Sequence, residues 1–131
     1  MRSILNGLCA IGLVAASLGA GTASAQTAAD QMAVAYQAAR NQLGVLTYCQ
    51  SKGFADEEAL AIQKKLLGLI PAPADTTGGD SAEELGKKGT ISAMGRTQDL
   101  EAGAKTQGSS VEALCQAMVK AIKQVASQLP K

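Results

Sequence analysis

The segment VLTYCQSKGF, residues 45–54, joins the end of a helical pattern to one cysteine and a glycine stop signal. Apolar side chains recur at steps of three or four from Met32 to Cys49, which places them on one helix face. Gly53 follows at a position where glycine commonly ends a helix. The pattern predicts a first helix over residues 27–51, with Cys49 pointing into the core from its last turn.

A second amphipathic pattern surrounds Cys115 near the end of the chain. Ser109 and Glu112 before it have the spacing of a capping box, and Pro130 stands after it. Its apolar stripe consists of Val111, Leu114, Cys115, Met118, Ile122, Val125 and Leu129. We therefore predict a last helix that carries Cys115 on its buried face, about one turn from its start.

Residues 1–25 have the plan of a secretory signal peptide. Arg2 supplies a positive start, residues 4–20 are mostly apolar or small, and Ala23 and Ala25 form an A-x-A cleavage site. As a transmembrane helix the segment is short, and it lacks a cluster of stop-transfer charges. We expect cleavage after Ala25, which leaves residues 26–131 as a single domain in the periplasm or outside the cell.

The cysteine count bears on how the domain is held together. Cys9 lies near the start of the apolar run rather than at its end, so we expect it to leave with the signal peptide and not to carry a lipid. Cys49 and Cys115 remain, and an even count in an oxidising compartment usually means pairing. A metal site would need more ligands, and a redox-active pair would need a C-x-x-C spacing. We predict a Cys49–Cys115 disulfide, which the chain-entropy model values at about 4 kcal/mol.

Two helices and a loop are predicted between the cysteines. Asp56 has the position of a helix cap, and Pro71 ends the helical pattern that follows it. Residues 71–80 contain two prolines, two glycines and no large apolar side chain, so they predict a loop. Ser81 and Glu84 then have the spacing of a capping box for a third helix.

The segment after Glu84 is rich in glycine and allows two interpretations. Gly86, Gly89, Gly95 and Gly103 interrupt a helix-like apolar pattern, at about 1 kcal/mol each relative to alanine. The glycines either let another backbone approach closely or divide the segment into short helices. We favour short helices with a break near residues 89–90, and we find no β-type alternation. The predicted fold is all-α, a small bundle of about four to five helices stapled by one disulfide.

The residues that usually carry chemistry are scarce. The chain has no histidine, so it lacks an ordinary general base near neutral pH and an imidazole metal ligand. Glu57–Glu58 and Glu83–Glu84 are adjacent pairs that do not face each other on a helix, and both stand at predicted helix starts. We expect no enzyme activity, and we assign no catalytic residue, cofactor or metal ligand. Once Arg2 is removed, acidic and basic residues are equal in number, so nucleic acid is not an expected partner.

Three stretches together resemble a known family: YQAARNQLGVLTYCQSKG, IPAPADTTGGDSAEELGKKGTISAMG and EALCQAMVKAIKQ. The family consists of small secreted alphaproteobacterial proteins labelled "pore-forming" and likened to the mycobacterial early secretory antigenic target. The resemblance implies a helical, secreted protein that is membrane-active or binds a partner. The chain lacks tryptophan and thus the Trp-x-Gly turn of the mycobacterial proteins, and no functional residue is carried over.

A second comparison concerns architecture alone. Small periplasmic acid-stress chaperones are also short, helical and tied by one disulfide, and this chain would titrate mainly near carboxylate pKa values, roughly pH 4. We therefore expect a non-enzymatic protein that acts through helix surfaces on a membrane or another protein. A periplasmic stress chaperone and a structural envelope protein are the alternatives.

Overall fold

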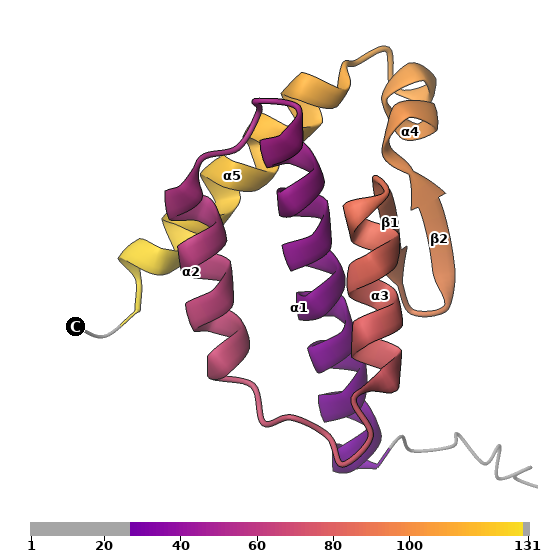
Figure 1. The fold of residues 1–131 in the computed structure, drawn as a ribbon, viewed down its shortest axis with the longest axis vertical. Coiled ribbons are helices and arrows are strands. Elements are labelled where there is room, and N and C mark those ends of the chain that lie inside the picture. Colours follow the sequence, from indigo (N-terminus) through magenta and orange to yellow (C-terminus); the bar gives the residue numbers. More distant parts are fainter. Residues whose placement is uncertain (1–26, 130–131) are drawn as a thin grey trace, which may run out of the picture.

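The computed structural model describes residues 27–129, so the predicted signal peptide and Pro130 lie outside the described residues. The described chain forms five helices and one antiparallel hairpin (Figure 1). In order, these are α1 (Ala28–Ser51), α2 (Glu57–Gly68), α3 (Thr77–Lys87), β1 (Thr90–Ala93), β2 (Arg96–Asp99), α4 (Leu100–Thr106) and α5 (Val111–Ser127). The predicted helical bundle with one disulfide is confirmed, and the small hairpin is an addition to it.

Helix α1 is the central element of the fold. In Figure 1, α2 and α3 lie on either side of it, and the hairpin and α4 follow along the edge beyond α3. Its most extensive packing is against α3, followed by α2. Helix α5 crosses obliquely near the C-terminal end of α1 and contacts α2, α1 and α4 less extensively. The α1–α3 pair is therefore the densest part of the molecule, and α5 is the more lightly attached.

Helix α1 begins and ends where its sequence predicts. The Thr27 hydroxyl accepts the backbone N–H of Asp30, whose carboxylate accepts the N–H of Thr27, as in a capping box. Gly53 has φ +80°, the left-handed conformation expected after the helix end. The predicted stripe is buried at Tyr36, Leu43, Leu46 and Cys49. Met32 is 39% exposed, contrary to its predicted place in the stripe, because the first turns of α1 are largely exposed.

Two glycines let α1 and α3 approach closely. A Cβ atom on Gly86 would lie 2.6 Å from the backbone nitrogen of Val45 and would overlap the carbonyl oxygen of Asn41. A Cβ on Gly44 would likewise overlap the backbone of Glu83. The interpretation that we did not favour, close backbone approach, is therefore correct for Gly86.

Helix α3 starts earlier than the sequence predicts. It begins at Thr77, so the loop after α2 is shorter than the predicted residues 71–80, and Ser81 lies inside the helix rather than at its cap. The Asp75 carboxylate accepts the backbone N–H of Thr77 at this start. Gly79 lies against the Tyr36 ring, so this glycine allows close helix packing where the pattern indicated a loop.

Residues 90–99 form a hairpin instead of the predicted short helices. β1 pairs with β2 in antiparallel register, with Thr90 opposite Asp99 and Ala93 opposite Arg96. The break predicted near residues 89–90 is present, since α3 ends there and Gly89 has φ +82°. The prediction is wrong after that point because a two-residue turn at Met94–Gly95 reverses the chain.

A buried amide fixes the hairpin to the two packed helices. Asn41 is 3% exposed, and its Nδ2 donates to the carbonyl oxygens of Ala82 in α3 and Thr90 in β1 at 2.8 and 3.0 Å. Its Oδ1 accepts the backbone N–H of Ser92 at 2.9 Å. One side chain of α1 thus satisfies backbone groups of two other elements, which a helix in place of β1 would not present in the same way.

The N-cap of α5 lies one residue later than predicted. The Ser110 hydroxyl, and not that of Ser109, accepts the backbone N–H of Ala113. Gly108 before it has φ +61°, a left-handed conformation that glycine adopts without strain.

Candidate functional site

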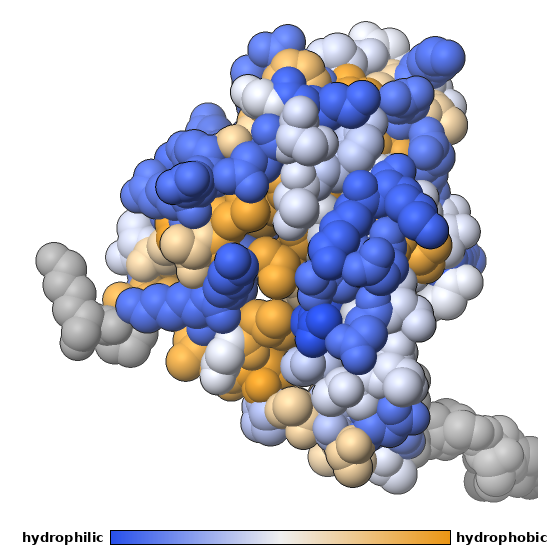
Figure 2. All heavy atoms as spheres, viewed as in Figure 1, coloured by the Kyte–Doolittle hydropathy of each residue, from blue (hydrophilic) through white to orange (hydrophobic). Residues whose placement is uncertain are grey.

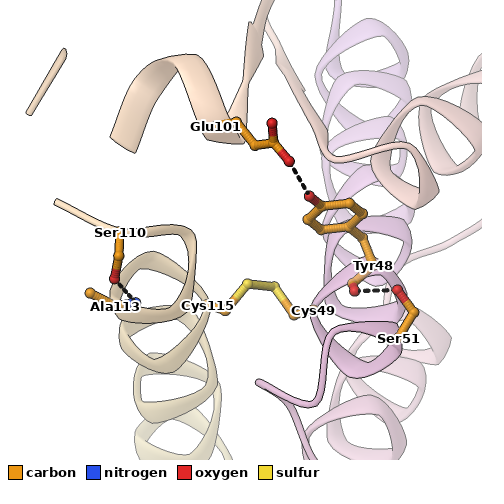
Figure 3. The surroundings of a disulfide bond; sticks show 7 residues. All are labelled: Tyr48, Cys49, Ser51, Glu101, Ser110, Ala113 and Cys115. Atoms are coloured by element: carbon orange, nitrogen blue, oxygen red, sulfur yellow. Dashed lines mark hydrogen bonds between the residues drawn. A yellow bond between two sulfur atoms is a disulfide. The ribbon is translucent and has the colours of Figure 1, made fainter. Parts of the chain in front are cut away.

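The predicted disulfide joins the last turn of α1 to the beginning of α5 (Figure 3). Cys49 and Cys115 are fully buried, with Cα atoms 5.7 Å apart, and they share a core cluster with Val45 and Leu100. Tyr48 and Phe54, on either side of Cys49 in the sequence, pack against this cluster, together with Ile91, Val111, Leu114 and Met118. The bridge therefore lies in the core that joins α1, α4 and α5.

Tyr48 links this core to α4. Its hydroxyl donates to the carboxylate of Glu101 at 3.3 Å (Figure 3). Burial, and then the neighbouring Glu101 carboxylate, raises the pKa of Tyr48 above its usual value. The phenol is thus kept in its neutral, donating form over the physiological range.

Two further contacts hold the second half of α5. Ile122 is 3% exposed and packs against Leu46 of α1 and Ala59 of α2. At the next position, Lys123, the ammonium lies 2.6 Å from Asp56 Oδ2 and 2.7 Å from Glu58 Oε2. We call this three-residue ion cluster (Asp56, Glu58 and Lys123) the α5 clamp.

Asp56 has two roles in the clamp. Besides binding Lys123, its carboxylate accepts the backbone N–H of Ala59 at 2.9 Å, which is its predicted role as cap of α2. These hydrogen bonds, with that from Lys123 the larger, hold the pKa of Asp56 below its usual value. The ammonium of Lys123 has a raised pKa because it donates to Asp56 and Glu58. Sequence reasoning found the cap but not the clamp, since no local pattern connects Asp56 to Lys123.

The lowered pKa of Asp56 predicts an acid-sensitive α5. A carboxyl whose pKa is lowered by folding stabilises the native state above its unfolded pKa, about 3.9, and this contribution is lost as pH falls through the folded value. We expect the hydrogen-exchange protection factors in the second half of α5 to fall more steeply below pH 4 in the wild type than in Asp56→Asn. Asparagine also caps helices, so this variant removes the clamp charge and keeps the cap. Parallel pH profiles for the two proteins would contradict the prediction.

The apolar stripe of α5 is only partly covered. Of the positions predicted to face the core, Cys115 and Ile122 are fully buried, and Val125 is 46% exposed. A shallow hollow of about 490 Å³ runs beside the helix, and its lining combines Phe54 and Val119 with polar side chains of α5, including Gln116, Lys120 and Lys123. Helix α5 therefore presents an accessible surface with both apolar and polar groups.

Further apolar surface lies away from α5. Figure 2 shows a strip of apolar atoms between α2 and α3, along the part of the surface where α1 lies between these two helices. Leu69, just after α2, is 64% exposed. Several other apolar side chains on α2 or directly after it are half-buried, namely Leu60, Ile62, Leu66, Leu67 and Ile70. The small core leaves part of the apolar side of α2 accessible to solvent.

The acid pairs considered in the sequence have separate structural roles. Glu57 and Glu58 lie in the first turn of α2, as predicted. Glu83 and Glu84 lie in the second half of α3 rather than at a helix start, because α3 begins at Thr77. Glu83 binds Arg40 of α1 and Lys87, so it contributes to the α1–α3 interface. Within residues 27–129, no group of three or more acidic, histidine or cysteine side chains is placed to hold a metal ion.

A search for membrane spans among the described residues finds no helix that combines the length and the apolar composition needed to cross a bilayer. Comparison of the chain with models of protein families, with curated proteins and with solved structures finds no match. The disulfide is compatible with an oxidising compartment, either the periplasm or the cell exterior. The candidate site is thus defined by the geometry of α5 alone.

Proposed function

We propose that this is a non-enzymatic secreted or periplasmic protein that binds a membrane surface or another protein through α5. The observation that carries the proposal is the partly covered apolar stripe of α5, in which Val125 is 46% exposed. A separate hollow lined by Phe54 and Val119 leaves a further apolar surface of the helix accessible. Amphipathic helices of this kind bind lipid interfaces or apolar grooves of partners. The family resemblance of the sequence supports the membrane surface as the first target to test.

Liposomes test this proposal with a matched pair of α5 variants. We expect the oxidised protein, residues 26–131, to sediment with liposomes, and Val125→Glu to weaken this binding about tenfold or more, because a buried valine contributes roughly 1.5–3 kcal/mol. Ala117→Glu is the control, since Ala117 is also exposed on α5 but lies outside the apolar stripe. Release of an entrapped dye measures pore formation in the same samples.

The outcomes separate the two targets. Absence of both binding and dye release at every pH and salt concentration would remove the membrane target and leave protein binding. Equal weakening by Val125→Glu and Ala117→Glu would show that added negative charge, and not the apolar stripe, determines binding.

A second candidate function, a periplasmic acid-stress chaperone, is supported by the α5 clamp. Protonation of Asp56 would remove one of the two ion-pair partners of Lys123, weaken the attachment of α5 to α2 and free apolar surface on both helices. An aggregation-prone client near pH 3 tests this function. Equal light scattering with and without the protein would refute it.

A further inference from the structure

The first residue of the hairpin turn, Met94, has a backbone conformation that is unfavourable for methionine. Met94 and Gly95 both have positive φ, +51° and +73°, as a two-residue type I′ turn requires. Asparagine is preferred at the first of these positions, whereas a non-glycine residue without a short polar side chain is strained there. Met94 is also 88% exposed, so no packing within the described residues offsets this strain. A strained and exposed apolar side chain points to a role outside the monomer.

A hollow of about 400 Å³ lies beside Met94, between the hairpin, α1 and α3. Its lining is apolar or small at most positions and carries no charged side chain: Val34, Gln37, Ala38, Ala82, Ser92 and Ala93, next to Met94 and Gly95. Gln37 lies against Gly78 of α3, where a Cβ atom would lie 2.5 Å from its Nε2. The hollow is thus built on the closely packed α1–α3 pair, and Met94 stands at its rim.

We propose that the occupant of this hollow is a second copy of the chain, with the Met94 side chain of each copy seated in the hollow of the other. The projection and the hollow belong to one patch, and such a patch is self-complementary across a two-fold axis, which closes the assembly at a dimer. The uncharged lining lets two copies meet without like-charge repulsion, whereas it offers no partner to a charged ligand. Methionine suits this contact because its flexible thioether adapts to irregular apolar surfaces.

The dimer is tested by mass measurement against concentration with sedimentation or light scattering. The patch is small, so we expect weak association, with Kd on the order of 10 μM to 1 mM. Met94→Asn should weaken association at least tenfold and also raise Tm by about 4 °C or more, because asparagine relieves the turn. A structural role for Met94 would instead lower Tm on substitution.

A matched pair of substitutions on α1 controls for charge. Ala38→Glu places a carboxylate in the hollow and should abolish the dimer. Ala35→Glu makes the same change at an exposed position that does not line the hollow, so this variant should still form the dimer. A mass of one chain up to about 1 mM would overturn the proposal. A dimer that persists in both Met94→Asn and Ala38→Glu would also overturn it, by placing the interface elsewhere. These outcomes are independent of liposome binding by α5.

Discussion

Replacing Gly86 by alanine is expected to lower the free energy of unfolding by about 3 kcal/mol or more, and Tm by roughly 10–20 °C. Alanine is ordinarily the better helix former, so propensity alone predicts the opposite sign. The added methyl group would lie 2.6 Å from the Val45 nitrogen and would overlap the Asn41 carbonyl oxygen. Both are backbone atoms of α1, so no side-chain rotation relieves the clash and the two helices must separate.

Gly68→Ala is the matched control for Gly86→Ala. Gly68 is the last residue of α2, and a Cβ atom there would meet no atom within 4 Å. We expect this variant to be neutral or to raise stability by up to about 1 kcal/mol. Chemical denaturation of both variants gives the two values. A Gly86→Ala protein as stable as Gly68→Ala would show that α1 and α3 are not closely packed in solution.

The contrast between these glycines shows what the sequence can and cannot predict about the fold. Gly53 and Asp56 act on neighbouring residues, and their roles as stop signal and cap were predicted correctly. Gly79 and Gly86 resemble loop or breaker glycines in sequence, but their role depends on backbone or rings of α1, more than 30 residues away. The error about where α3 begins follows from this long-range dependence.

The hairpin was missed for a related reason. Its pattern is short, and β2 (Arg96–Asp99) is exposed at every position, so no alternation of buried and exposed residues marks it. Its position depends on the three hydrogen bonds of Asn41, which join residues at least 41 positions apart. The sequence does not reveal the partners of a buried asparagine such as Asn41, because the asparagine binds backbone groups, which every residue has.

The contacts of the candidate site also differ in whether the sequence predicts them. Cys49 and Cys115 were paired from their number and the expected compartment, without knowledge of the fold. The Lys123–Asp56 contact has no such counting rule, because many lysines and acids are available and their distances depend on how α5 crosses α2. The disulfide is therefore predictable from the sequence, because each cysteine has one possible partner. The ion pair is not, because each charged side chain has many.

Loss of the disulfide is expected to detach α5 before the rest of the molecule unfolds. The bridge encloses most of the domain, and the chain-entropy model gives it about 4 kcal/mol, a large share of a typical total of roughly 5–15 kcal/mol. Without it, α5 keeps the packing of Ile122 and the α5 clamp, whereas α1 and α3 keep their whole interface. We therefore expect Cys49→Ala/Cys115→Ala to lose hydrogen-exchange protection first in α5 and least in α1 and α3.

Comparison of the double alanine variant with the reduced wild type separates the effect of losing the disulfide bond from the effect of replacing two buried side chains. Both should unfold at a Tm lower by roughly 10–20 °C than the oxidised protein, and added reductant should leave the variant unchanged. A uniform loss of protection over all helices would contradict the independent release of α5 and would indicate one cooperative unit. Selective release would instead free the α5 stripe, so the reduced protein should bind liposomes more tightly than the oxidised one if α5 is the binding surface.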